Sequence, residues 1–169
     1  IIMKRFLIIA IAAMTAIAAS AQPRAIGGRL GSELEVSYQH NVGQKANFIE
    51  ANLGMTLIGL GLNAAGSYNF MIAQPEWTSK GEWGFYAGPA VNGGYSAWGA
   101  LYGYGAGSGF IGLGGQIGLE YTFDFPLQLS VDLRPTVGAR FGKGYVGFYS
   151  GGLWGFVPSL AIRYHFGWK

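Results

Sequence analysis

The segment from Leu127 to Arg140 alternates apolar and non-apolar residues without exception. Seven apolar residues occupy the odd positions from Leu127 to Ala139, and seven polar, charged or glycine residues occupy the even positions. Because side chains two residues apart lie on the same face of a β-strand, this pattern predicts a strand with one apolar and one polar face. The segment therefore favours a fold built from two-faced strands.

The same period of two recurs along most of the chain. It predicts further strands at Glu33–His40, Asn47–Met55, Leu62–Ala73, Trp83–Tyr95, Ile111–Phe123 and Leu153–Trp168. Single-chain bacterial barrels have an even number of strands. We therefore expect an eighth strand at Arg24–Leu30, joined to the next by a tight hairpin at Gly31–Ser32. The alternative is one long strand from Ala25 to His40.

The composition narrows the choice of fold. Half of the residues are hydrophobic and only 11% are charged, whereas soluble domains contain about 25% charged residues. After Ala21, no apolar run is long enough for a membrane helix. A closed β-barrel can still contact lipid, because every backbone N–H and C=O is paired between strands. We therefore predict an all-β fold, an eight-stranded antiparallel up-and-down transmembrane β-barrel. A soluble lipocalin-like barrel, polar on its outside, is the main alternative.

The first 21 residues have the three parts of a secretory signal peptide. Two positive residues precede an uncharged run over residues 6–19, and an Ala-Ser-Ala cleavage site ends at Ala21. The run is shorter than the roughly 20 residues of a membrane-spanning helix, which disfavours a membrane anchor. We expect the signal peptide at 1–21, the barrel domain at 22–169 and a location in the bacterial outer membrane. The chain has no cysteine, which excludes disulfides and a cysteine-linked lipid anchor.

The strand order predicts which connections share an end of the barrel. With the N-terminus in the periplasm, the periplasmic turns are Val42–Lys45, Gln74–Gly81 and Asp124–Pro126, and the external loops lie near Gly31, near Gly59, at 96–109 and at 141–152. Aromatic residues gather near the expected periplasmic ends: Tyr38, Phe70, Trp83, Phe85, Tyr121, Phe123, Tyr164, Phe166 and Trp168. Such a girdle is typical of a membrane interface.

Almost every charged residue of the predicted strands falls on the inward face. This predicted polar network of the lumen comprises Arg29, Glu33, Glu35, Glu50, Glu82, Glu120, Asp132, Arg134, Arg140, Arg163 and His165. The interior of an eight-stranded barrel is just wide enough for side chains to fill, and buried charges need partners. We favour a structural network that plugs the lumen. A proton or ion path, or acid–base chemistry by a carboxylate pair such as Glu50 and Glu120, is the alternative.

The sequence offers little support for an enzyme. It contains no G-x-S-x-G and no H-E-x-x-H motif, and its two histidines, His40 and His165, lie on opposite predicted faces. We therefore predict no catalytic residue, no metal site and no cofactor. The net charge after signal removal is about +1, which argues against nucleic-acid binding.

The long external loops are the expected sites of contact with other molecules. The segments 96–109 and 141–152 are rich in glycine and tyrosine, so they either bind an extracellular ligand or are mobile loops with interfacial aromatics. The other expected partners are outer-membrane lipid and the barrel-insertion machinery. The predicted role is structural or surface-interactive, in a monomer. A narrow pore is the second hypothesis, and a lipid-modifying enzyme with Asn92 and Arg140 near its outer rim is the third.

Several segments resemble a known family. AIGGRLGSELEVSYQH, NFIEANLG, WGFYAGPA, GQIGLEYTFDFPLQLSVDLRP and LAIRYHF resemble small outer-membrane β-barrel proteins common in Bacteroides-like bacteria. The resemblance covers nearly all of the mature chain, is most specific at Gly115–Pro135, and extends in architecture to the eight-stranded barrels of the OmpA/OmpX type. It implies a fold and a location but no reaction. Barrels of this kind usually end in an aromatic residue, whereas this chain ends in Lys169 after Trp168.

Overall fold

The computed structural model describes residues 23–43, 46–56, 61–97, 107–151 and 158–167. These residues form ten β-strands: β1 (Pro23–Leu30), β2 (Glu33–Asn41), β3 (Phe48–Thr56), β4 (Gly61–Ala73), β5 (Glu82–Ser96), β6 (Ser108–Thr122), β7 (Leu127–Leu133), β8 (Thr136–Gly142), β9 (Tyr145–Gly151) and β10 (Ser159–His165). Within these ranges no helix is long and apolar enough to cross a membrane. The predicted signal peptide, the turn near Gly59, the tip of loop 96–109, and Trp168 lie outside the described residues.

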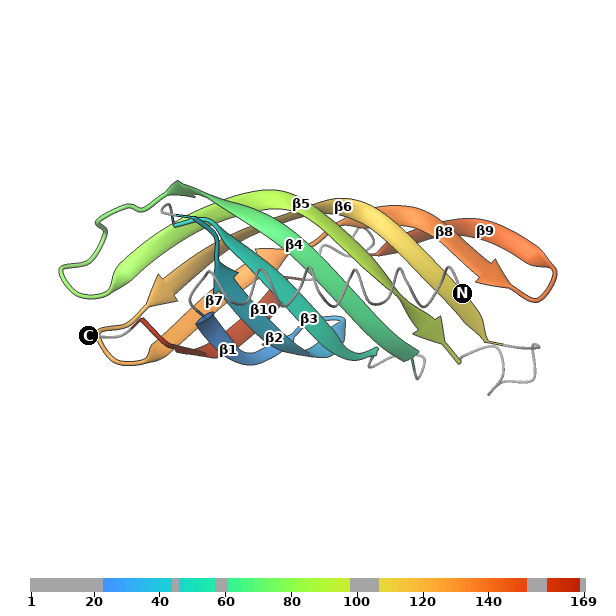
Figure 1. The fold of residues 1–169 in the computed structure, drawn as a ribbon, viewed down its shortest axis with the longest axis horizontal. Helices are drawn as coiled ribbons and strands as arrows, with labels where there is room; N and C mark the ends of the chain where they lie inside the picture. The colour runs from blue at the N-terminus through green and yellow to red at the C-terminus, as the bar shows by residue number, and fades with distance from the viewer. Residues whose placement is uncertain (1–22, 44–45, 57–60, 98–106, 152–157, 168–169) are drawn as a thin grey trace.

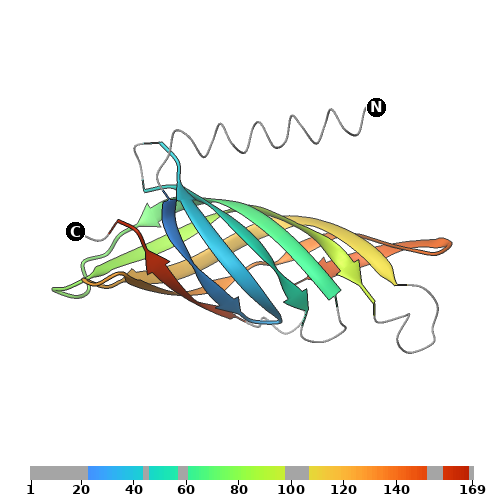
Figure 2. The same ribbon diagram turned by 60° about the horizontal axis from the view of Figure 1, so that its bottom comes forward.

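Eight of the strands form a closed antiparallel barrel (Figures 1 and 2). Each strand from β1 to β6 pairs with the next along the chain, and β10 closes the ring by pairing with both β7 and β1. The two ends of the barrel differ in their turns. The Asp124 end carries the turn 124–126, and the Gly31 end carries the turn Gly31–Ser32. The predicted eight-stranded barrel is confirmed.

The β1–β2 hairpin confirms the strand predicted at Arg24–Leu30 and the tight turn at Gly31–Ser32. Leu30 pairs with Leu34 across the two-residue turn, and Arg29 pairs with Glu35. Both strands alternate between exposed and buried residues, with Leu30 outside and Arg29 inside. The alternative of a single strand from Ala25 to His40 is therefore wrong.

Strands β7 and β8 lie along one line beside β6 and share one register. Ile117 pairs with Leu133, and Gly114 pairs with Thr136, so no residue is inserted between the two strands. Pro135 separates them because it has no N–H to donate to the ladder; its carbonyl still accepts a hydrogen bond from the Gly115 N–H at 3.1 Å. The alternation predicted from Leu127 to Arg140 is correct, but the strand is interrupted at its proline.

The segment predicted as the external loop 141–152 is largely a β-hairpin. Strands β8 and β9 pair from Thr136–Gly151 to Gly142–Tyr145, and Gly144 adopts φ 81° in the turn between them, which glycine tolerates. The hairpin extends past the other strands at the Gly31 end (Figure 1). Sequence reading missed it because the glycines of this segment, from Gly138 to Gly151, interrupt the alternation of a two-faced strand. In the other predicted loop, Ser96 and Ser108 also pair as strand residues.

The barrel is polar inside and apolar outside. Exposed residues include Leu53, Leu62, Leu113, Leu160 and Ile162, each more than half exposed. Nearly all fully buried side chains are polar, and the largest of them belongs to Arg163. Phe48 and Tyr86 are the fully buried aromatic residues of the described ranges, and their rings meet edge to face at 5.1 Å. The inward and outward faces predicted for the strands are confirmed for most of the described residues, and Arg24 and His40 are exceptions.

Candidate functional site in the barrel interior

A network of ion pairs crosses the barrel interior. It joins four arginines, Arg24, Arg29, Arg134 and Arg163, to five acids, Glu33, Glu35, Glu50, Glu120 and Asp132. Apart from Glu33, whose side chain is 17% exposed, none of these side chains is more than 9% exposed. The strands supply these residues at alternate positions, because the side chains that face inward are two residues apart.

Arg163 occupies the middle of the barrel. Its Nη2 donates to Glu50 at 2.9 Å, its Nε donates to Ser37 at 2.8 Å, and its Nη1 donates to Ser130 at 2.7 Å. Glu50 also accepts hydrogen bonds from Ser37 and Gln39, both at 3.1 Å. This central cluster joins β10 to β2, β3 and β7 and satisfies all three nitrogens of the guanidinium.

A second cluster lies toward the Gly31 end. Arg29 binds Asp132 through Nε and Nη2 and also pairs with Glu35. Arg134 donates to Glu35 at 2.6 Å, whereas its nearest approach to Glu33 is 3.8 Å. The Glu33 contact is the longest of the six ion pairs and exceeds hydrogen-bond distance.

A third cluster lies toward the Asp124 end and contains a residue that sequence reading missed. Arg24 pairs with Glu120, donates to Gln39 at 3.2 Å and lies 4.1 Å from the centroid of the Phe48 ring. The alternation of β1 predicts Arg24 on the outer face with Ile26. A β-bulge between Pro23 and Ala25 reverses this direction, because a bulge adds one residue to a strand opposite its partner.

Glu50 and Glu120 belong to different clusters of the ion-pair network. Glu50 has Arg163 as its ion-pair partner, and Glu120 has Arg24. Gln39 bonds to both Glu50 and Arg24 and so lies between the two acids. The two carboxylates therefore do not form the acid–base pair that the alternative interpretation requires.

Three predicted members do not join the ion-pair network. Glu82 is exposed, and His165 is half-buried. Both line a cavity of about 560 Å³ at the Asp124 end, because they stand at strand ends, where the inward face opens to solvent. Arg140 is on β8, beyond the closed ring, and its guanidinium lies 5.8 Å from the centroid of the Tyr149 ring. The predicted network is corrected at these three positions.

His40 also departs from its prediction. The alternation places it on the outer face, but its side chain is only 5% exposed. Its Nδ1 lies 2.9 Å from the hydroxyl of Tyr38. No group of three or more metal-binding side chains occurs among the residues that the structure describes.

Neutral polar residues complete the interior, and sequence analysis did not single them out. Asn63 donates to both Glu33 and Glu35, Ser67 donates to Gln116 at 2.6 Å, and Gln128 donates to Glu120 at 3.4 Å. All lie at inward positions of their strands, so the alternation of residues would have been enough to find them. Because the prediction collected only charged residues and His165, it missed the amides and hydroxyls that link them.

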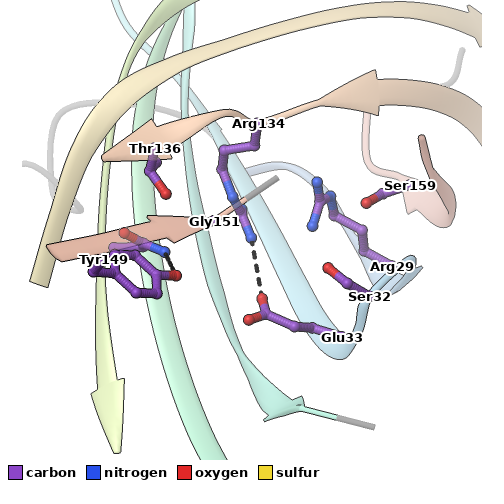
Figure 3. Close-up of a pocket in the computed structure, with 9 residues that line it drawn as sticks. Arg29, Ser32, Glu33, Arg134, Thr136, Tyr149, Gly151 and Ser159 are labelled. Atoms are coloured by element: carbon purple, nitrogen blue, oxygen red, sulfur yellow. Dashed lines mark hydrogen bonds and ion pairs between the residues drawn. The ribbon is translucent and has the colours of Figure 1, made fainter. Parts of the chain in front are cut away.

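The interior also has a cavity at the Gly31 end. It has a volume of about 60 Å³ and lies between the β1–β2 turn, β8 and β9 (Figure 3). Its lining includes Arg29, Glu33 and Arg134 from the ion-pair network. Side chains of the three clusters lie between this cavity and the larger one at the Asp124 end.

No protein-family model matches this chain, and neither the curated proteins nor the solved structures contain a match. The family resemblance read from the sequence therefore stays a prediction.

Proposed function

We propose that this chain is an exported outer-membrane β-barrel whose lumen is plugged by the ion-pair network and whose role is structural or surface-interactive. The observation that carries the proposal is the polarity of the closed barrel, with charged side chains inside and large apolar side chains outside. A soluble barrel would need the reverse arrangement, because water favours polar surfaces and apolar cores. Transmembrane barrels have an outer apolar band and a polar interior.

Aromatic residues at the Asp124 end support the same proposal. Trp83 contacts Trp77 and Tyr121, Tyr121 contacts Phe123, and Phe123 contacts Phe125, with ring centroids 4.6–5.4 Å apart. On other strands, Tyr68 meets Phe70 and Tyr164 meets Phe166. Aromatic side chains favour the headgroup level of a bilayer. The Asp124 end then faces the periplasm, and the β8–β9 hairpin faces outward.

The network supports a plugged barrel over a pore. An ion pair in a low-dielectric interior is stable only when the geometry is good and the remaining hydrogen-bonding groups are satisfied. Arg163 meets this condition with three acceptors. A conducting lumen would have to keep water and mobile ions where these side chains lie.

Planar-bilayer recordings of the refolded protein test this proposal. The protein is first refolded in detergent, and its folding is checked by the heat-dependent gel shift typical of membrane barrels. We expect insertion into vesicles and no steady current. A failure to insert, with the protein folded and soluble without detergent, would overturn the membrane assignment. Steady conductance would contradict the plugged barrel and support the narrow pore. In that case, neutralising Arg134 or Glu120 should change the ion selectivity.

A further inference from the structure

The cavity at the Gly31 end contains charged groups with unused hydrogen-bonding capacity. The Arg134 side chain is only 6% exposed, and its Nη1 has no hydrogen-bond partner within the described part of the chain. A buried donor without an acceptor destabilises the folded chain. Arg134 therefore favours a ligand that brings an acceptor to this cavity.

Glu33 supplies the opposite charge at the same cavity. It is the most exposed acid of the ion-pair network, and its carboxylate stands 3.8 Å from Arg134 Nη2. Figure 3 shows the two side chains pointing toward each other. Since this distance exceeds a hydrogen bond, the pair is loose enough for a small molecule to bind both charges at once.

Hydroxyl groups surround this loose pair. Ser32 and Ser159 line the cavity from one side, and Thr136 and Tyr149 line it from β8 and β9 (Figure 3). Hydroxyls both donate and accept, so they can bind either end of a polar ligand. The cavity volume of about 60 Å³ is several times the roughly 10–15 Å³ that one water molecule needs, so the cavity suits a ligand of only a few heavy atoms.

The two groups left without a close partner select the ligand class. Arg29 and Arg134 are paired with Glu35 and Asp132 nearby, so Glu33 has no arginine within hydrogen-bond distance and Arg134 Nη1 has no acceptor. A cation would satisfy only Glu33 and an anion only Arg134, whereas a molecule with one charge of each sign satisfies both. We propose that this cavity binds a small zwitterion of the α-amino acid type, with its carboxylate on Arg134 and its ammonium on Glu33.

Titration with glycine tests the proposal on the full mature chain refolded in detergent micelles. Binding is followed by the NMR shifts of the backbone amides of Ser32, Thr136 and Ser159 in isotope-labelled protein. Acetate and methylammonium are the single-charge probes, and glycerol is the uncharged probe. We expect saturable shifts with glycine, and an affinity about tenfold higher than that of any of the other three probes.

Variants separate the two charged contacts. Glu33→Gln and Arg134→Gln should each weaken glycine binding by about tenfold or more. Because Arg134→Gln also breaks the pair with Glu35, Ser159→Ala serves as a milder variant and should weaken binding several-fold. His165→Gln, at the Asp124 end, is the matched control and should bind glycine as the parent does. The gel shift must show that every variant is folded.

Several results would overturn the proposal. Acetate binding as tightly as glycine, with no effect of Glu33→Gln, would make the cavity an anion site. Equal binding of glycerol would make it a general polar cavity. The absence of saturable shifts up to ~100 mM glycine would remove the site, because binding weaker than this is worth little more than ~1 kcal/mol. The test requires only the folded barrel, so its failure is distinct from failure of membrane insertion or of the closed lumen.

Discussion

Arg24 and Glu120 form an ion pair across the barrel, with the Arg24 guanidinium over the ring of Phe48. The two residues are 96 positions apart in the chain and come from β1 and β6, which are not neighbours in the ring. This contact spans the lumen at the Asp124 end, between two strands that β7 and β10 separate in the ring. Its stability depends on the bulge that turns Arg24 inward.

Removing one partner of this ion pair should strongly destabilise the barrel. Arg24→Ala leaves the Glu120 carboxylate buried without its arginine, and such a loss typically costs about 3–5 kcal/mol. The measurement is urea-dependent unfolding in detergent micelles. Lys143→Ala, which removes an exposed charge from the β8–β9 turn, is the control and should leave the midpoint unchanged. An unchanged midpoint for Arg24→Ala would show that the pair contributes nothing.

A charged side chain on the outer face should lower the stability of the barrel if that face contacts lipid. Val131 lies on the outer face of β7 and is 38% exposed. Val131→Arg should cost about 2–4 kcal/mol near the middle of the bilayer, measured by reversible refolding into vesicles. Ser79→Arg, in the exposed turn at the Asp124 end, should have little effect. Equal stability of the two variants would contradict the membrane assignment of this face.

Two glycines provide a matched pair for the packing between strands. A Cβ built on Gly88 would lie 1.8 Å from the backbone oxygen of Tyr68, whereas a Cβ on Gly28 would meet nothing within 4 Å. Gly88→Ala should destabilise the barrel by more than about 1 kcal/mol, because a backbone atom must move. Gly28→Ala should be neutral or stabilising by about 0.4–1 kcal/mol. Unfolding curves that rank the two variants in the opposite order would contradict the wall geometry.

Shortening Arg163 should open the lumen. Among the described residues its side chain is the largest that is fully buried, and it reaches β2, β3 and β7. Arg163→Ser should give a measurable single-channel current, whereas we expect none from the parent protein. Arg140→Ser, outside the ion-pair network, should stay silent. If the folded Arg163→Ser barrel conducts no better than the parent, another part of the interior forms the seal.

The alternation of residues predicted the barrel and most of its interior because a strand has only two faces. Once Leu129 is assigned to the outer face, Gln128 and Ser130 must point inward. Arg24 could not be placed in this way, since a bulge reverses the parity and leaves no clear mark in the sequence. Glu82 and His165 could not be placed for another reason. The alternation predicts whether a side chain points inward or outward, but not how far it lies from the end of the barrel. Pairing partners depend on register, which one sequence does not specify.

The sequence distances within the ion-pair network have a consequence for folding order. Arg163 binds Ser37 and Glu50, residues 126 and 113 positions earlier in the chain, and it reaches them only after β10 has joined β1. Until then Glu50 would lack its arginine inside an unclosed sheet. Ring closure and neutralisation of this central carboxylate should therefore coincide, because the last strand of the ring brings the arginine that pairs with it.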